Sequence, residues 1–94
     1  KSATFFFRVQ GDSMREAGIL DGDIVAVDRS LEPQHGLIVI AVVNGECTIK
    51  RLHKSRSGIE LRAENPNYPP IAIAADTQLE VWGVVCGVVR RYPA

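Results

Sequence analysis

Short runs of apolar and β-branched residues, separated by turn-forming residues, recur along the whole chain. Side chains of a strand alternate between the two faces of a sheet, and a strand buried on both faces reads as a continuous apolar run. Both patterns occur here, whereas the 3.6-residue period of an amphipathic helix is almost absent. We predict strands at residues 4–10, 23–28, 37–43, 46–52, 59–63, 71–74 and 79–92.

Turn-forming residues predict how these strands are joined. Asn44-Gly45 lies between two β-prone runs and predicts a tight hairpin. The three prolines of residues 65–70 predict a rigid loop, because proline lacks the N–H that a sheet needs. Gly83 and Gly87 interrupt the last run and predict a bulge or bend there. The expected fold is therefore mainly β.

The composition narrows the class of protein. A chain of 94 residues with 46% hydrophobic content suits one small domain, residues 1–94. A chain of this size buries only about 60 to 70% of its unfolded surface, so a core shared with a second copy would add stability. Eleven basic residues balance eleven acidic ones. This balance argues against a general nucleic-acid binder, which carries a basic surplus.

Targeting signals and metal-ligand spacings are not recognisable in the sequence. No apolar run approaches the roughly 18 residues that cross a membrane, and no signal peptide opens the chain, so we expect a cytoplasmic protein and no membrane contact. Cys47 and Cys86 are expected to be buried free thiols, although a single disulfide stays open. Neither they nor His35 and His53 lie at a ligand spacing, so we expect no metal and no cofactor.

Ser13 is the first candidate for chemistry, because Gly11-Asp12-Ser13-Met14 forms a bend after the first strand and exposes a hydroxyl. A serine hydroxyl attacks poorly without an adjacent base. His53 is a weak candidate for that base, since strand parity turns it away from Lys50 and it enters a polar turn. A carboxylate or calcium site is disfavoured as well, because aspartates in Gly-containing turns usually cap their own backbone; these are Asp12, Asp21, Asp23 and Asp28.

Lys50 is the remaining candidate base, and it would pair with Ser13 as nucleophile. Its amine must be neutral, against a reference pKa of about 10.4, and burial can supply a drop of about three units. The backbone amides of Ser13 and Met14 are the natural oxyanion donors for such a pair. A Lys50-Arg51 dipeptide on a hairpin is more often a solvated cationic edge, and that alternative stays open from the residues alone.

Several segments together resemble the C-terminal peptidase domain of the LexA/UmuD family; they are residues 11–14, 18–28, 45–52, 60–65, 68–71 and 81–85. The resemblance implies a self-cleaving serine peptidase on a mainly β fold, with Ser13 as nucleophile and Lys50 as base. It also implies a homodimer and cleavage stimulated by a RecA-type filament on single-stranded DNA.

Within that family, three features resemble UmuD-type mutagenesis proteins: Asp12, Gln34-His35-Gly36 and residues 81–85. This subtype implies a role in SOS mutagenesis, in which the processed protein joins a UmuC-like Y-family polymerase subunit for translesion synthesis. The alternative is the peptidase and dimerisation domain of a LexA-type repressor. No DNA-reading helix is predicted, so we expect no sequence-specific DNA binding by this domain.

The resemblance also predicts where cleavage and dimerisation occur. The family's scissile Ala-Gly or Cys-Gly bond lies upstream of the serine, and the residues before Ser13 contain no such pair, so we expect that an N-terminal arm is missing. Ala17-Gly18 and Cys86-Gly87 follow the serine and are not expected to be processed. The predicted dimer interface is the last strand, with Trp82, Val84, Val85, Val88 and Val89.

Overall fold

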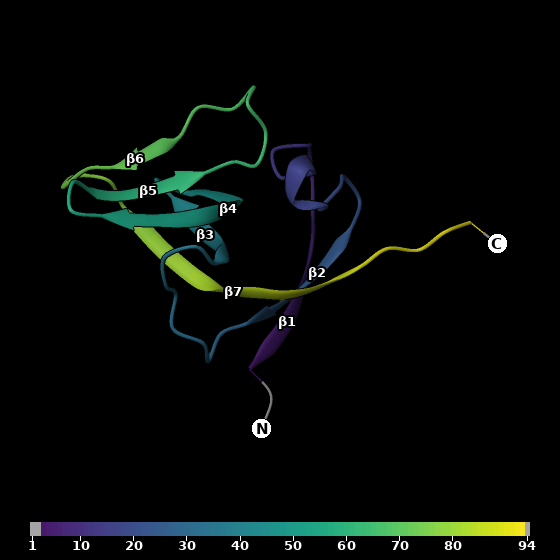
Figure 1. Ribbon diagram of the computed structural model, residues 1–94. Coiled ribbons are helices and arrows are strands. Elements are labelled where there is room, and N and C mark those ends of the chain that lie inside the picture. Colours follow the sequence, from purple (N-terminus) through teal and green to yellow (C-terminus); the bar gives the residue numbers. More distant parts are fainter. Residues whose placement is uncertain (1–2, 94) are drawn as a thin grey trace.

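The computed structural model describes residues 3–93, which form one antiparallel β-sheet and a single turn of 3-10 helix (Figure 1). The elements are β1 (Thr4–Arg8), η1 (Arg15–Ala17), β2 (Ile24–Asp28), β3 (Ile38–Val43), β4 (Glu46–Ser55), β5 (Gly58–Arg62), β6 (Ile71–Ile73) and β7 (Leu79–Val89). The mainly β prediction is confirmed. In the part of the chain that the structure describes, no helix is long and apolar enough to span a membrane.

The predicted strands are all present, but some ends differ. The strand predicted to end at Gln10 ends at Arg8, and the one predicted to end at Tyr92 ends at Val89. In contrast, β4 runs to Ser55, beyond the predicted end at Leu52, because β5 pairs with its second half. Pairing with a neighbouring strand, which local composition does not report, decides these ends.

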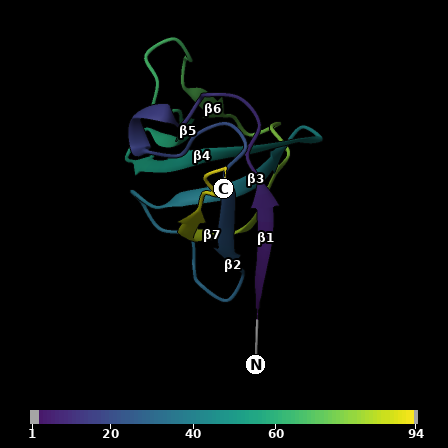
Figure 2. The ribbon, with the colours of Figure 1, turned by 90° about the vertical axis from the view of Figure 1, so that its right-hand side faces the viewer.

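The strand order is β1-β2-β7-β3-β4-β5-β6, with every neighbouring pair antiparallel. The long strand β7 lies in the middle and serves two partners: its first half pairs with β3 and its second half pairs with β2. Figure 2 shows β1 and β2 running across the direction of β3 and β4. The sheet is therefore strongly twisted, and β7 joins its two halves.

Two bulges in β7 confirm the irregularity predicted at its glycines. The pairing shifts between Ala26 and Val27 of β2 and between Ile40 and Ala41 of β3, and these shifts leave Cys86 and Trp82 unpaired. A β-carbon on Gly83 would lie 2.7 Å from Val27 Cγ1 and 2.9 Å from the Asp28 carbonyl oxygen. The absence of a side chain there lets β7 approach β2 closely, and bulges increase local twist.

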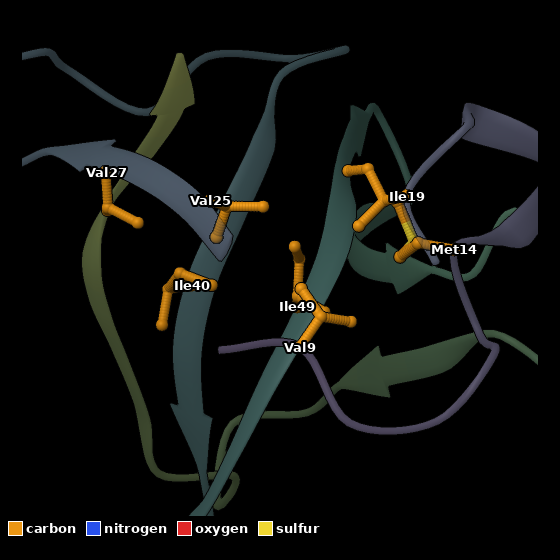
Figure 3. Close-up of a cluster of buried hydrophobic side chains, with 7 residues drawn as sticks. All are labelled: Val9, Met14, Ile19, Val25, Val27, Ile40 and Ile49. Carbon is orange, nitrogen blue, oxygen red and sulfur yellow. The ribbon is translucent and has the colours of Figure 1, made fainter. Parts of the chain in front are cut away.

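Apolar side chains pack on both faces of the sheet. Ile40 joins one cluster and its neighbours Val39 and Ala41 join the other, which explains the continuous apolar run at residues 37–43. The first cluster, shown in Figure 3, contains Val9, Met14, Ile19, Val25, Val27, Ile40 and Ile49. The second contains Val39, Ala41, Leu52, Leu61 and Val84.

The two cysteines correct one prediction. Both thiols are free, but Cys47 and Cys86 are exposed rather than buried. Cys47 precedes the part of β4 that β5 covers, and Cys86 is the unpaired residue of a bulge. The β-prone runs around them suggested burial, whereas strand pairing left both at uncovered positions.

Candidate active site

The loop that carries Ser13 connects β1 to η1 and is held from the side of β2. Gly11 adopts φ 87°, a left-handed conformation that suits glycine, and its N–H donates to Asp21 Oδ1 at 2.7 Å. Val9 exchanges backbone hydrogen bonds with the same turn: its N–H donates to the Asp23 carbonyl, and its carbonyl accepts from Gly22, each at 2.8 Å. The bend predicted at residues 11–14 is therefore a rigidly held loop.

The residue after Ser13 anchors this loop in the core. Met14 is 1% exposed, the largest fully buried side chain among the described residues, and it packs with Val9, Ile19 and Ile49 (Figure 3). Ser13 itself is half-buried, with its hydroxyl at the surface of a cleft. The buried Met14 side chain thus fixes the backbone while the serine hydroxyl stays accessible.

Lys50 lies on β4, opposite Val39 of β3, and is buried with 7% of its surface exposed. Its Nζ lies 3.0 Å from Ser13 Oγ, 2.7 Å from Thr48 Oγ1 and 3.0 Å from the Ile49 carbonyl oxygen. Among the described residues, no carboxylate lies within ion-pair distance of this amine. Lys50 is therefore not a solvated cation at the edge of the hairpin.

Burial lowers the pKa of the Lys50 amine below its ordinary value of 10.5, because desolvation disfavours the charged form. All three hydrogen-bond partners of Nζ are neutral, so no counterion opposes this shift. In the neutral amine, Nζ carries a lone pair that can accept the proton of Ser13 Oγ. The arrangement can therefore generate a serine alkoxide without a histidine.

Ser13 and Lys50 line a cleft of about 420 Å³, together with Arg8, Asp12, Thr48 and Tyr68. Along this cleft, residues 46–50 of β4 pair with β3 on one edge and not with β5 on the other, because the pairing with β5 begins at Arg51.

The loop after β5 packs against the serine loop, a contact that sequence reasoning missed. Glu64 N–H donates to the Ser13 carbonyl at 2.8 Å, and Asn65 Nδ2 donates to the Asp12 carbonyl at 2.9 Å. Tyr68 Oη donates to Asp12 Oδ1 at 2.6 Å. The sequence marked residues 65–70 only as a rigid loop, since no local pattern reports which segment such a loop touches.

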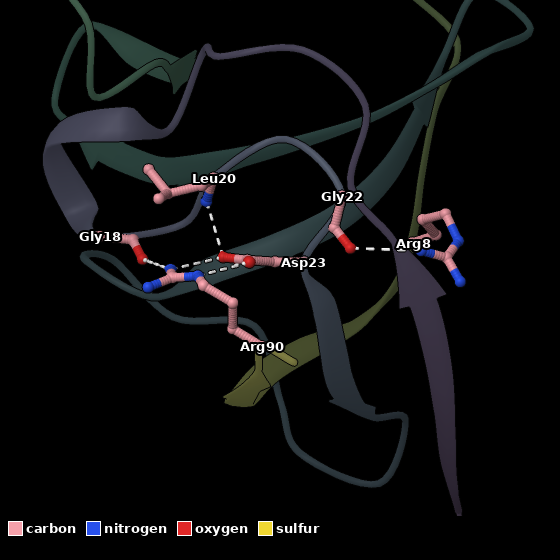
Figure 4. A network of polar contacts seen from close by, with 6 residues as sticks. All are labelled: Arg8, Gly18, Leu20, Gly22, Asp23 and Arg90. Atoms are coloured by element: carbon pink, nitrogen blue, oxygen red, sulfur yellow. Dashed lines mark hydrogen bonds and ion pairs between the residues drawn. The ribbon is translucent and has the colours of Figure 1, made fainter. Parts of the chain in front are cut away.

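The aspartate side chains near the site accept hydrogen bonds from other groups of the chain, as Figure 4 shows for Asp23. Asp23 is 2% exposed; it accepts from Leu20 N–H and forms two 2.7 Å hydrogen bonds with Arg90. The Arg90 hydrogen bonds hold the pKa of Asp23 below its usual value. Asp28 caps its own turn at Ser30, as predicted, but Asp23 also binds the distant Arg90, and Asp12 binds Tyr68. No group of three metal-ligating side chains occurs among residues 3–93.

The histidines lie away from the serine. The rings of His35 and His53 stack edge to face with centroids 4.9 Å apart, and His35 Nδ1 accepts from Lys54 N–H at 3.0 Å. Neither histidine lines the cleft. The side chain brought to Ser13 is Lys50.

Most of the chain is similar to known proteins. The model of the Peptidase S24-like family matches residues 1–86. The chain is 48% identical over 87 residues to LexA repressor 1 of Xanthomonas campestris pv. campestris and to LexA repressor 2 of Pseudomonas syringae pv. tomato, covering 93% of this chain and 43% of each relative. It is 42% identical over 89 residues to the LexA repressor of Bordetella pertussis, covering 95% of this chain and 41% of that protein. The chain thus spans about two fifths of these relatives, and it belongs to the Peptidase S24-like family.

Proposed function

We propose that this chain is the catalytic domain of a self-cleaving serine peptidase in which Ser13 is the nucleophile and Lys50 the general base. The 3.0 Å contact between Lys50 Nζ and Ser13 Oγ carries the proposal, because the amine is buried and has no carboxylate partner among residues 3–93. Thr48 Oγ1 and the Ile49 carbonyl orient Nζ toward the serine. Such a pair meets the requirement that a hydroxyl nucleophile has an adjacent base.

The proposed reaction balances within these groups. Ser13 Oγ attacks the scissile carbonyl carbon as its proton passes to Nζ, and the carbonyl oxygen becomes an oxyanion near the N–H groups of Ser13 and Met14. Nζ then protonates the leaving amine, and an acyl ester on Ser13 remains. Water then gives a proton to the same amine and attacks the ester carbonyl. As the ester C–O bond breaks, Nζ returns that proton to Ser13 Oγ, which restores the free serine and the neutral amine and releases the new carboxylate.

The rate of cleavage should rise with pH as one ionisation whose midpoint lies below 10.5. The neutral amine is the active base, and burial lowers the pKa of Lys50, so the active fraction grows as the pH rises through that lowered value. The measurement is the initial rate of trans cleavage of an arm-bearing LexA-type protein or of a peptide with its Ala-Gly bond, followed across pH. A rate that stays constant across this pH range, or that falls as the pH rises, would contradict Lys50 as the base.

For the biological role we propose a LexA-type self-cleaving transcriptional repressor, of which this chain is the peptidase and dimerisation domain. The relatives named above are all LexA repressors, and the chain spans about two fifths of their length. These relatives favour the repressor over the UmuD-type mutagenesis protein, and they lend no support to a UmuC-like polymerase partner. Such a repressor would act in the cytoplasm and be cleaved when a RecA-type filament forms. The complete reading frame tests this role, since a repressor requires a helix-turn-helix segment.

A homodimer is part of the same proposal, with exposed apolar residues of β7 as its interface. Val84 is buried in the core, but Trp82, Val88 and Val89 of β7 are 37%, 41% and 55% exposed. Exposed apolar side chains gathered on one strand favour contact with a second copy. We expect a dimer at micromolar concentration in sedimentation equilibrium and a shift toward monomer in Val89→Asp. A wild-type monomer throughout that range would contradict the dimer.

A further inference from the structure

Both carbonyl groups that flank the Ser13 backbone point toward the same loop. The Asp12 carbonyl accepts from Asn65 Nδ2 at 2.9 Å and from the Arg15 N–H of its own turn at 3.2 Å, and the Ser13 carbonyl accepts from Glu64 N–H at 2.8 Å. The Glu64 carbonyl in turn accepts from Glu16 N–H at 2.9 Å. Residues 64 and 65 therefore contact the serine loop on both sides of the serine.

Because peptide bonds are planar, the directions of the Asp12 and Ser13 carbonyls also fix the directions of the Ser13 and Met14 N–H groups. In a trans peptide the C=O and the following N–H point in opposite directions. With both carbonyls turned toward residues 64 and 65, the N–H groups of Ser13 and Met14 point away from them. Within the residues that the structure describes, neither N–H donates a hydrogen bond. Two uncommitted amides thus flank the serine hydroxyl.

The loop that orients these peptides is itself firmly held. Asn65 is 4% exposed, and its Oδ1 accepts from Asn67 N–H at 3.0 Å, which fixes the amide so that Nδ2 faces Asp12. Glu64 Oε2 accepts from Arg51 Nε at 3.0 Å, and Arg51 follows Lys50 on β4. One short loop therefore connects the strand of Lys50 to the backbone of Ser13.

We propose that Asn65 is a positioning residue: its side-chain amide, which makes the shorter of the two hydrogen bonds to the Asp12 carbonyl, fixes the Asp12–Ser13 peptide plane together with the Arg15 N–H and so aims the Ser13 N–H at the developing oxyanion. This inference rests on the proposed peptidase function. The Glu64 N–H does the same for the peptide that carries the Met14 N–H, but a backbone donor cannot be removed by a side-chain change. Substitution of Asn65 is thus the way to test whether this loop positions the Ser13 N–H.

Asn65→Asp is the decisive variant, because it keeps the shape of the side chain and its acceptor for Asn67 N–H but replaces the donor with an oxygen. We expect kcat for trans cleavage to fall about 10²-fold with KM within about threefold of wild type, as for a misaimed oxyanion donor. Asn67→Asp is the matched control: it lies in the same loop, adds the same charge and is exposed. Its kcat should stay within about twofold of wild type.

The two proposals fail in distinguishable ways. A wild-type protein that does not cleave would overturn the peptidase function, whereas active wild type with kcat unchanged in folded Asn65→Asp would overturn the positioning role alone. An equal fall in Asn67→Asp would also overturn it, since loop charge would then be the cause. The midpoint of the pH profile should stay close to that of wild type in Asn65→Asp. A pH profile that no longer shows the ionisation would mean that Asn65 acts on the Lys50 base and does not aim the Ser13 N–H.

Amide exchange in the wild-type protein supplies a test that needs no variant. The Glu64 N–H, which donates to Ser13, should exchange slowly with solvent, and the Ser13 and Met14 N–H groups should exchange much faster. Strong protection of the Ser13 N–H would show that it is already hydrogen-bonded, and the inference would then be wrong even if Asn65→Asp failed to fold.

Discussion

Ser13→Ala and Lys50→Met should each lower the rate of trans cleavage by about 10⁴-fold or more, a loss of the size found when a nucleophile or its base is removed from a serine peptidase. Ser13→Ala removes the attacking oxygen. Lys50→Met keeps the length and burial of the side chain but removes the only proton acceptor seen next to Ser13 Oγ among the described residues. The measurement is the initial rate with an arm-bearing substrate at the pH of greatest wild-type activity.

Lys50→Arg separates a base from a mere cation in the same place. Arginine keeps the positive charge but is not deprotonated in proteins, so this variant should be as inactive as Lys50→Met. The urea concentration at which Lys50→Met unfolds should be at least as high as for wild type, because the substitution removes the cost of desolvating a buried amine. Substantial cleavage by a folded Lys50→Met or Lys50→Arg protein would rule out the pair.

Met14→Ala should lower the free energy of unfolding by about 2–5 kcal/mol, the usual cost of truncating a fully buried large side chain. Met14 is 1% exposed and fills the first cluster beside Val9, Ile19 and Ile49 (Figure 3). A loss of this size is a large share of the roughly 5–15 kcal/mol that stabilises a small domain. Urea denaturation monitored by Trp82 fluorescence or circular dichroism measures it.

Met14→Leu is the matched control, because a volume-conserving exchange costs less than about 1.5 kcal/mol. We further expect the folded Met14→Ala protein to cleave more slowly than Met14→Leu, since the buried side chain anchors the backbone next to Ser13. Equal unfolding free energies of the two variants would show that Met14 does not anchor the loop.

Local patterns in the sequence predicted most of the fold. The hairpin at Asn44-Gly45 is present, with left-handed φ of 48° and 86° at its two residues. Irregular pairing near Gly83 and Gly87 is confirmed as two bulges. These features depend on side-chain period and on the φ that each turn demands, and both are properties of a few neighbouring residues.

Local sequence patterns predicted much less of the candidate site. Residue chemistry alone names Ser13 and Lys50 as a possible nucleophile and base, but it favours a serine in an ordinary turn and a solvated cation on a hairpin. The family resemblance is what favours the pair. The loop at residues 64–68 and the Asp23–Arg90 pair carried no signal that named their partners. The burial predicted for Cys47 and Cys86 was wrong, because strand pairing and not residue type decided their exposure.

By itself, then, the sequence determined the mainly β class, the positions of the strands and turns, and the candidate residues for chemistry. Only the tertiary structure decided that Lys50 is buried, that its Nζ lies 3.0 Å from a serine 37 positions away, and that Asn65 faces the Asp12 carbonyl. The physical reason is that period and turn chemistry act over a few residues. Desolvation of an amine and the aim of a peptide plane depend on segments that meet only when the sheet is complete.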